Sequence, residues 1–156
     1  MDVQIKQLPA MRVGAIRHIG AYNRISEAFE TLCGIAGPAG ILEAPDTEMV
    51  ALYHDDPEST PADQLRSDAG LTMPAGATLP NGLTEQRIPA GRYASTVHVG
   101  PYEQLPDSWK RFMGEWIPAS GHRLRDDAPA YEVYLNDPGT TPKEELQTEI
   151  RLPLTS

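Results

Sequence analysis

The chain contains two copies of one sequence module. When the sequence is shifted by 80 positions, residues 8–32 lie on residues 88–112 with six identities. These identities are Pro9/Pro89, Ala10/Ala90, Arg12/Arg92, His18/His98, Gly20/Gly100 and Tyr22/Tyr102. A shift of 81 places residues 50–71 on 131–152, with the identities Tyr53/Tyr134, Asp56/Asp137, Pro57/Pro138, Thr60/Thr141, Pro61/Pro142, Leu65/Leu146 and Leu71/Leu152. Two aligned blocks in one order indicate a tandem duplication. Two copies are too few for a solenoid, so they predict a pseudo-two-fold pair around a shared core.

Each copy has the same order of predicted elements. In the first copy, loose alternation and β-branched residues predict strands at 3–8, 11–19, 48–54 and 64–73. A helix is predicted between the second and third strands, ending at the Gly-Pro-Ala-Gly run 37–40, from apolar residues three and four apart: Ile25, Phe29, Leu32 and Ile35. In the second copy the strands fall near 83–88, 91–99, 130–136 and 145–152, around a helix that we expect to begin at Pro106 and to end at Pro118.

These elements predict an α+β fold in one domain, residues 1–156. Its parts are module one (1–74), a connector (75–82) and module two (83–156). The modules are expected to form an antiparallel sheet with two equivalent helices on one face.

Composition narrows the range of functions. The 156 residues carry a formal net charge of −9, which repels nucleic-acid phosphates, so we do not expect direct nucleic-acid binding. A cationic ligand or a basic protein partner is compatible with this charge. One cysteine, Cys33, fits a reducing compartment, and no apolar run has the length of a signal peptide or membrane span. We therefore expect a cytoplasmic protein without membrane contact. Cys33 aligns with Met113 and is expected in a helix core.

Residues that both copies share are expected to shape the backbone. His18 and His98 align with each other, so we interpret both as scaffold residues rather than metal ligands. His54 and His122 lie outside any metal-ligand spacing. The sequence therefore predicts no metal and no cofactor.

The most informative difference between the copies is Glu132, which stands where the first copy has Ala51. Alternation along the strand places Glu132 and Tyr134 on one face, with Tyr131 and Val133 on the other. A carboxylate in an apolar strand is costly unless it is paired or hydrogen-bonded. Glu132 is therefore on a solvated face, or paired with an arginine, or at the base of an aromatic cleft. The arginines to examine first are Arg17 and Arg92.

The second copy also has the larger aromatic residues. Trp109 replaces Phe29, Trp116 replaces Ala36 and Tyr93 replaces Val13. Tryptophans at helical spacing usually belong to a core, but an aromatic box around a carboxylate suits a flat or cationic organic molecule. The candidate ligand-binding residues are Glu132, Tyr134, Trp109, Trp116, Met113, Tyr22, Phe29, Tyr53 and Tyr102.

Three segments resemble the GyrI-like family, also described as the effector-binding domain of AraC- and MerR-type regulators. They are ALYHDDPESTPADQLRSDAG in the first copy, and HVGPYEQLPDSWKRF and YEVYLNDP in the second. The resemblance extends along essentially the whole chain and is strongest to the stand-alone branch that includes the DNA gyrase inhibitor SbmC. It implies two βαββ (SHS2-type) modules, with a ligand cleft between them at the pseudo-two-fold axis. It also implies that Glu132 matches a glutamate that contacts cationic, aromatic ligands in drug-sensing members.

Three functions compete at this point. The first is a small-molecule-binding protein of toxin or drug response, with Glu132 as the polar anchor. The second is a DNA gyrase inhibitor that acts by protein–protein contact. The third is a metal-independent hydrolase of reactive electrophilic natural products, with Glu132 and Tyr134 as an acid/base pair. The 156 residues show no nucleophile elbow and no helix-turn-helix, so we expect neither an acyl-enzyme nor a DNA-binding regulator.

Overall fold

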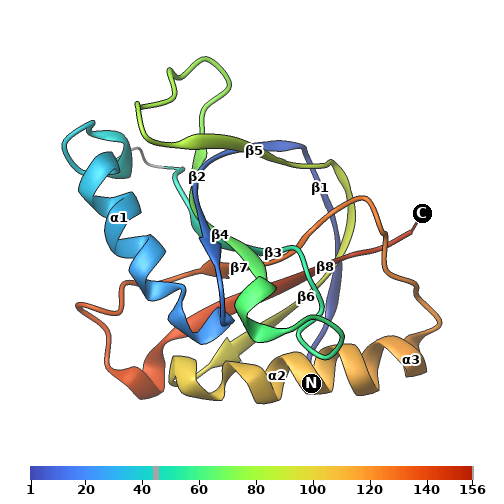
Figure 1. Ribbon diagram of the computed structural model, residues 1–156. Coiled ribbons are helices and arrows are strands. Elements are labelled where there is room, and N and C mark those ends of the chain that lie inside the picture. The colour runs from blue at the N-terminus through green and yellow to red at the C-terminus, as the bar shows by residue number, and fades with distance from the viewer. Residues whose placement is uncertain (44–45, 156) are drawn as a thin grey trace. The chain divides into compact units, whose positions relative to one another are not determined.

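The computed structural model describes residues 1–43 and 46–155. It confirms an α+β fold in which two compact units each hold four antiparallel strands and a helix (Figure 1). We call residues 10–89 the module-one unit, and residues 1–9 with 90–155 the module-two unit.

In the module-one unit the strands are β2 (Met11–Ile19), β3 (Met49–Tyr53), β4 (Arg66–Met73) and β5 (Thr84–Ile88). Their order in the sheet is β3-β4-β2-β5, and each neighbouring pair is antiparallel. Helix α1 (Ser26–Ala36) runs along β2 and β4 (Figure 1). The helix ends where predicted, before the Gly-Pro-Ala-Gly run.

The module-two unit repeats this plan with β1 (Gln4–Leu8), β6 (Gly91–Val99), β7 (Ala130–Tyr134) and β8 (Gln147–Pro153). Their order is β1-β6-β8-β7, again antiparallel throughout. The predicted strands are therefore confirmed in both copies.

The compact units do not coincide with the predicted modules 1–74 and 83–156. Strand β1, from the first sequence copy, pairs with β6, while β5, from the second copy, pairs with β2. The units divide at Pro9 and at Pro89, two aligned prolines. Proline lacks the N–H group that a ladder requires, so each proline interrupts its strand and lets the two halves pair with strands of different units.

The helix of the module-two unit extends past Pro118, so the predicted end was wrong. Helix α2 (Leu105–Arg111) continues as a π-helical turn (Phe112–Trp116) and as α3 (Ile117–Ser120). Pro118 is accommodated because it lies in the first turn of α3, directly after the widened turn. Gly121 then ends the helix with a φ of +81°, in the left-handed region.

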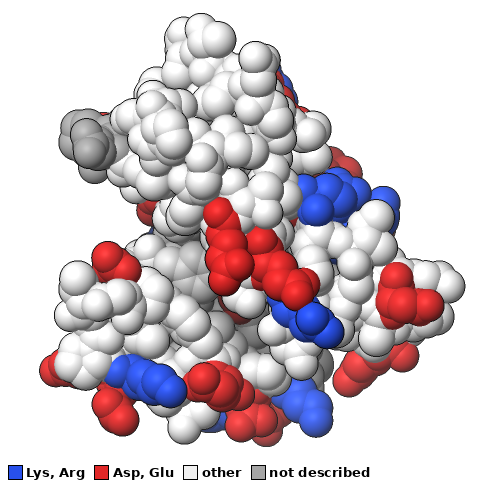
Figure 2. Space-filling view, turned by 60° about the vertical axis from the view of Figure 1, so that its left-hand side comes forward, with Lys and Arg blue, Asp and Glu red and all other residues white. Residues whose placement is uncertain are grey.

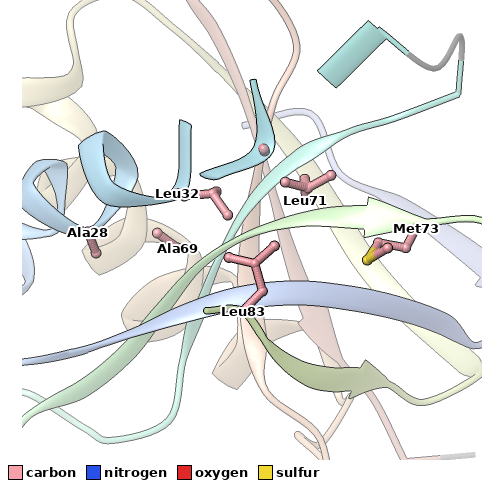
Figure 3. Close-up of a cluster of buried hydrophobic side chains, with 7 residues drawn as sticks. Ala28, Leu32, Ala69, Leu71, Met73 and Leu83 are labelled. Carbon is pink, nitrogen blue, oxygen red and sulfur yellow. The ribbon is translucent and has the colours of Figure 1, made fainter. Parts of the chain in front are cut away.

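Each helix covers one face of its own sheet with an apolar cluster. Alternate residues of β4 meet α1 residues that are four apart, and Leu83 completes the cluster (Figure 3). Its buried members are Ala28, Leu32, Ala36, Ala69, Leu71, Met73 and Leu83. The corresponding cluster under α2 consists of Ala94, Leu105, Phe112, Ile150, Leu152 and Leu154.

Cys33 and Met113 lie outside these clusters, so the prediction of a core position was wrong for Cys33. Cys33 is exposed, and Met113 is 42% exposed. The buried stripe of α1 follows residues 28, 32 and 36, and Cys33 is turned away from it.

We expect Leu71→Ala to destabilise the protein by about 3 kcal/mol, because Leu71 is fully buried between α1 and the sheet. Urea unfolding followed by circular dichroism measures this change. The matched control is Leu42→Ala, at a residue that is 36% exposed. Equal destabilisation by both substitutions would contradict this placement of the core.

Candidate functional site

Glu132 lies on the helix-covered face of the module-two sheet. In the β7–β8 ladder it is paired with Ile150, a member of the cluster under α2. Cross-strand partners point to the same face, so the carboxylate is directed toward the helix. Glu132 is only 3% exposed. The solvated-face alternative is therefore excluded.

Two aromatic side chains hydrogen-bond to the Glu132 carboxylate. The indole Nε1 of Trp109, on α2, donates to Oε2 at 2.6 Å. The hydroxyl of Tyr134, two residues along β7, donates to Oε1 at 2.9 Å. Both donors are neutral groups, so these bonds stabilise the carboxylate without neutralising its charge. The carboxylate and phenol of the hydrolase hypothesis are thus in direct hydrogen-bond contact.

A fourth predicted residue, Tyr102, joins this group. Its ring centroid lies 5.5 Å from that of Tyr134, with the ring planes tilted by 59°. Burial raises the pKa of Tyr102, and the negative charges of Asp137 and Glu132 raise it further. The field of the Glu132 carboxylate therefore reaches the Tyr102 hydroxyl. We call Glu132, Trp109, Tyr134 and Tyr102 the Glu132 cluster.

The rings of the Glu132 cluster are partly exposed, whereas the carboxylate is buried. The two cavities described in this unit lie elsewhere: Arg92 and Arg125 line one, and Lys6 and Ser95 line the other. At Glu132 the donors Trp109 and Tyr134 occupy the space next to the carboxylate. A ligand that contacts Glu132 would therefore need one of these side chains to rotate.

Two other predicted residues lie farther along the same helix. Trp116 packs edge-on against Phe112, with centroids 5.5 Å apart, and stacks on His122 at 5.9 Å. Met113 projects into solvent from the same π-helical turn.

The remaining predicted residues belong to the module-one unit. Tyr22 and Tyr53 form a pair with centroids 4.7 Å apart, which matches the Tyr102/Tyr134 pair in the repeat. The Tyr22 hydroxyl donates to the carbonyl of Asp55 at 2.7 Å. Phe29 packs against the α1 cluster, and Ala51, in place of Glu132, is fully buried. The first copy thus keeps the aromatic pair and has no carboxylate at this position.

Sequence reasoning missed a pair of buried acids, Asp68 and Glu149, at aligned positions of the repeat. Asp68 is 1% exposed; Arg17 Nε donates to its Oδ1 at 2.8 Å, and His54 Nε2 lies 2.5 Å from its Oδ2. Arg17 was a candidate partner of Glu132, but its described partner is Asp68. The pKa of Asp68 is lowered: burial opposes this shift, and His54 and Arg17 outweigh it. Glu149 aligns with Asp68 in the repeat. An acidic residue at the same strand position of both copies was the sequence signal that could have identified this pair.

Glu149 is the buried acid of the second copy. It accepts hydrogen bonds from Arg151 Nε at 2.7 Å, Ser95 Oγ at 2.7 Å and Lys6 Nζ at 3.0 Å. Burial opposes ionisation, but these donors lower the pKa of Glu149 to about 2. Its cross-strand partner is Val133, so Glu149 lies on the sheet face opposite the Glu132 cluster.

The two aligned histidines have the same local role, as the repeat predicted. His18 Nε2 lies 3.0 Å from the carbonyl oxygen of Ala21, and His98 Nε2 lies 3.2 Å from that of Pro101. Each holds the turn that follows its strand. Within residues 1–43 and 46–155 no three His, Cys, Asp or Glu side chains are grouped as a metal site would require. None of the described helices is long and apolar enough to cross a membrane.

Comparison with known proteins gives one family and one fold. A family model described as "GyrI-like small molecule binding domain" matches residues 1–155. A DNA gyrase inhibitor of Escherichia coli strain K12 is 30% identical over 141 residues, covering 88% of this chain and 87% of the relative.

Two solved structures share the fold at lower identity. The EcmrR C-terminal domain superposes with a TM-score of 0.76 at 20% identity, covering 99% of this chain and 98% of that one. SAV2435 bound to tetraphenylphosphonium gives a TM-score of 0.68 at 13% identity, covering 100% and 95%.

Proposed function

The chain belongs to the GyrI-like small-molecule-binding family, and we propose that it binds amphipathic, aromatic organic cations at the Glu132 cluster. In this proposal the Glu132 carboxylate provides the counter-charge, and the three aromatic rings provide the apolar surface. The function belongs to a response to toxic or drug-like compounds.

One observation carries the proposal: the buried Glu132 carboxylate accepts hydrogen bonds from two neutral aromatic donors. They are the Trp109 indole at 2.6 Å and the Tyr134 hydroxyl at 2.9 Å. A carboxylate in a low-dielectric site attracts a cation more strongly than one in water. Indole and phenol faces attract cations as well, through the negative face of the ring. Flat, apolar cations combine both interactions, whereas hydrated inorganic ions lack the apolar surface.

Two further observations support the cationic class. SAV2435, which shares the fold, is bound to tetraphenylphosphonium, an apolar cation. The formal net charge of −9 raises the local concentration of cations and lowers that of anions. Acidic and basic side chains are interspersed on the face in Figure 2.

A charge-matched ligand pair tests the proposal on the wild-type protein. Tetraphenylphosphonium and tetraphenylborate have nearly the same shape and opposite charges. Isothermal titration calorimetry should show saturable binding of the cation, together with a change in tryptophan fluorescence, because Trp109 contacts Glu132. The anion should bind at least about tenfold more weakly. Equal affinity for the two ions would reject a site that selects by charge.

Direct inhibition of DNA gyrase is the second candidate, and the name of the Escherichia coli relative favours it. An acidic protein can occupy a basic surface that normally holds DNA. We expect a supercoiling assay with purified gyrase to show inhibition that Glu132→Gln leaves unchanged, since the buried carboxylate cannot reach a partner surface. No inhibition at a large molar excess would exclude this function.

A further inference from the structure

Arg12 and Arg92 occupy equivalent positions of the repeat but have different surroundings. Arg12 is saturated with acceptors. Its Nε and Nη2 donate to the Glu85 carboxylate at 3.1 and 2.8 Å, and its Nη1 donates to the carbonyls of Pro74, Ala75 and Ala77 at 2.8–3.0 Å. In the first copy, an internal carboxylate therefore satisfies this arginine.

Arg92 has no such carboxylate. The residue aligned with Glu85 is Ile5, which is 41% exposed and apolar. Within residues 1–43 and 46–155 the Arg92 guanidinium has neither a hydrogen-bond acceptor nor an ion-pair partner. Arg92 is only partly exposed.

A cavity of about 440 Å³ opens beside Arg92. Gln7, the cross-strand partner of Arg92, and Thr155 add an amide and a hydroxyl to its wall, and Leu154 adds apolar surface. This volume falls within the range of small-molecule pockets. The cavity lies wholly in the module-two unit and includes no member of the Glu132 cluster.

A second arginine lines the same cavity. Arg125 is fixed by Asp127, at 2.9 and 3.1 Å, and by the carbonyl of Ala90 at 3.0 Å. It lies over Gly91, where a Cβ atom would come within 2.7 Å of Arg125 Nη1. Gly91 has a φ of +151°, and the first copy has Met11 at this position. The second copy therefore has the glycine that leaves room for Arg125. The Asp127 carboxylate offsets the charge of Arg125, whereas no carboxylate within residues 1–43 and 46–155 is paired with Arg92.

We propose that the Arg92–Arg125 cavity binds the carboxylate group of a small organic anion. The first copy shows the aligned arginine bound to a carboxylate: Arg12 Nε and Nη2 both donate charge-assisted hydrogen bonds to Oε1 of Glu85. In the second copy, a ligand carboxylate takes the place of that side chain. This site is independent of the Glu132 cluster and has the opposite charge preference.

The test uses benzoate, phenyl phosphate and the neutral benzamide at constant ionic strength, because salt screens exposed charges. Nitrogen-15 NMR spectra follow the Nε–H signals of the arginines. Benzoate should shift the Arg92 and Arg125 signals in a saturable manner, and benzamide should not. Arg92→Gln should weaken benzoate binding about tenfold or more, through loss of the charge-assisted hydrogen bonds.

Arg111→Gln is the matched control, since Arg111 is 62% exposed on α2, and it should leave benzoate binding unchanged. Tetraphenylphosphonium binding should be the same in wild type and Arg92→Gln, which separates this site from the proposed function. Unfolding curves establish that each variant is folded. Arg92→Lys keeps the positive charge but loses the planar set of guanidinium donors, so it should bind benzoate with intermediate affinity. The proposal is overturned if benzoate shifts do not saturate, if benzamide matches them, or if only phenyl phosphate saturates.

Discussion

Glu132→Gln should weaken tetraphenylphosphonium binding by about tenfold or more, which corresponds to about 1.4 kcal/mol or more of binding free energy. The substitution keeps the size of the side chain and an oxygen that accepts from Trp109 or Tyr134. It removes the negative charge that the proposed function assigns to cation binding. Titration calorimetry on the folded variant measures the change.

The matched control for this prediction is Glu115→Gln. Glu115 is 75% exposed in the same unit, so its substitution makes the same change in net charge without altering the Glu132 cluster. Its affinity for tetraphenylphosphonium should remain close to that of wild type, because exposed charges are screened. If both variants lost affinity equally, the net charge rather than Glu132 would be responsible.

Arg151→Ala should destabilise the protein by about 3–5 kcal/mol. Arg151 is 7% exposed; it donates to Glu149 at 2.7 and 3.2 Å and to the Tyr131 hydroxyl at 3.1 Å. Its removal leaves Glu149 with Ser95 and Lys6 as described donors at a site that is 4% exposed. Removing only the cation of a buried ion pair lowers the free energy of unfolding more than removing both partners, because the carboxylate stays buried without its main counter-charge. Chemical unfolding at neutral pH measures the effect.

This destabilisation should decrease at acidic pH. Glu149 has a folded-state pKa of about 2 against an ordinary value of 4.5, so its ion pair stabilises the wild type above pH 4.5. The stabilisation is lost as pH falls through this interval toward 2. The difference between wild type and Arg151→Ala should therefore shrink over the same interval. If the difference in unfolding free energy between wild type and Arg151→Ala stayed constant from pH 7 down to about pH 2, the ion pair with Glu149 would not be its cause.

Two further variants separate burial from charge pairing. The double substitution Glu149→Leu with Arg151→Met should be more stable than Arg151→Ala, because no buried charge remains. Arg66→Ala removes the partner of Asp55 at an exposed pair and should have little measurable effect. If the double variant were less stable than Arg151→Ala, the destabilisation would arise from packing rather than from the unpaired carboxylate.

Local sequence pattern was sufficient for most of the fold. Each strand of one copy has an equivalent in the other, so a weak pattern such as 3–8 gained support from its repeat. Period-two alternation placed Glu132 and Tyr134 on one face, and the structure brings them within hydrogen-bond distance.

Other features depend on contacts between distant segments. The bond from Trp109 to Glu132 is set by the position of α2 over β7, which no local pattern specifies. The exchange of β1 and β5 between the two units follows from strand pairing rather than from strand propensity. Arg92 was considered only as a partner of Glu132, because its cavity is formed by residues as distant in sequence as Gln7 and Thr155. The predicted ligand cleft between the two modules stays a prediction.

The most direct test of the central claim is a crystal structure of the wild-type protein with tetraphenylphosphonium. We predict that the cation lies against the Glu132 carboxylate, with its phenyl rings on Trp109, Tyr102 and Tyr134, and that Trp109 or Tyr134 has rotated away from its present hydrogen bond. A cation bound at another site, with both hydrogen bonds to Glu132 intact, would contradict the account.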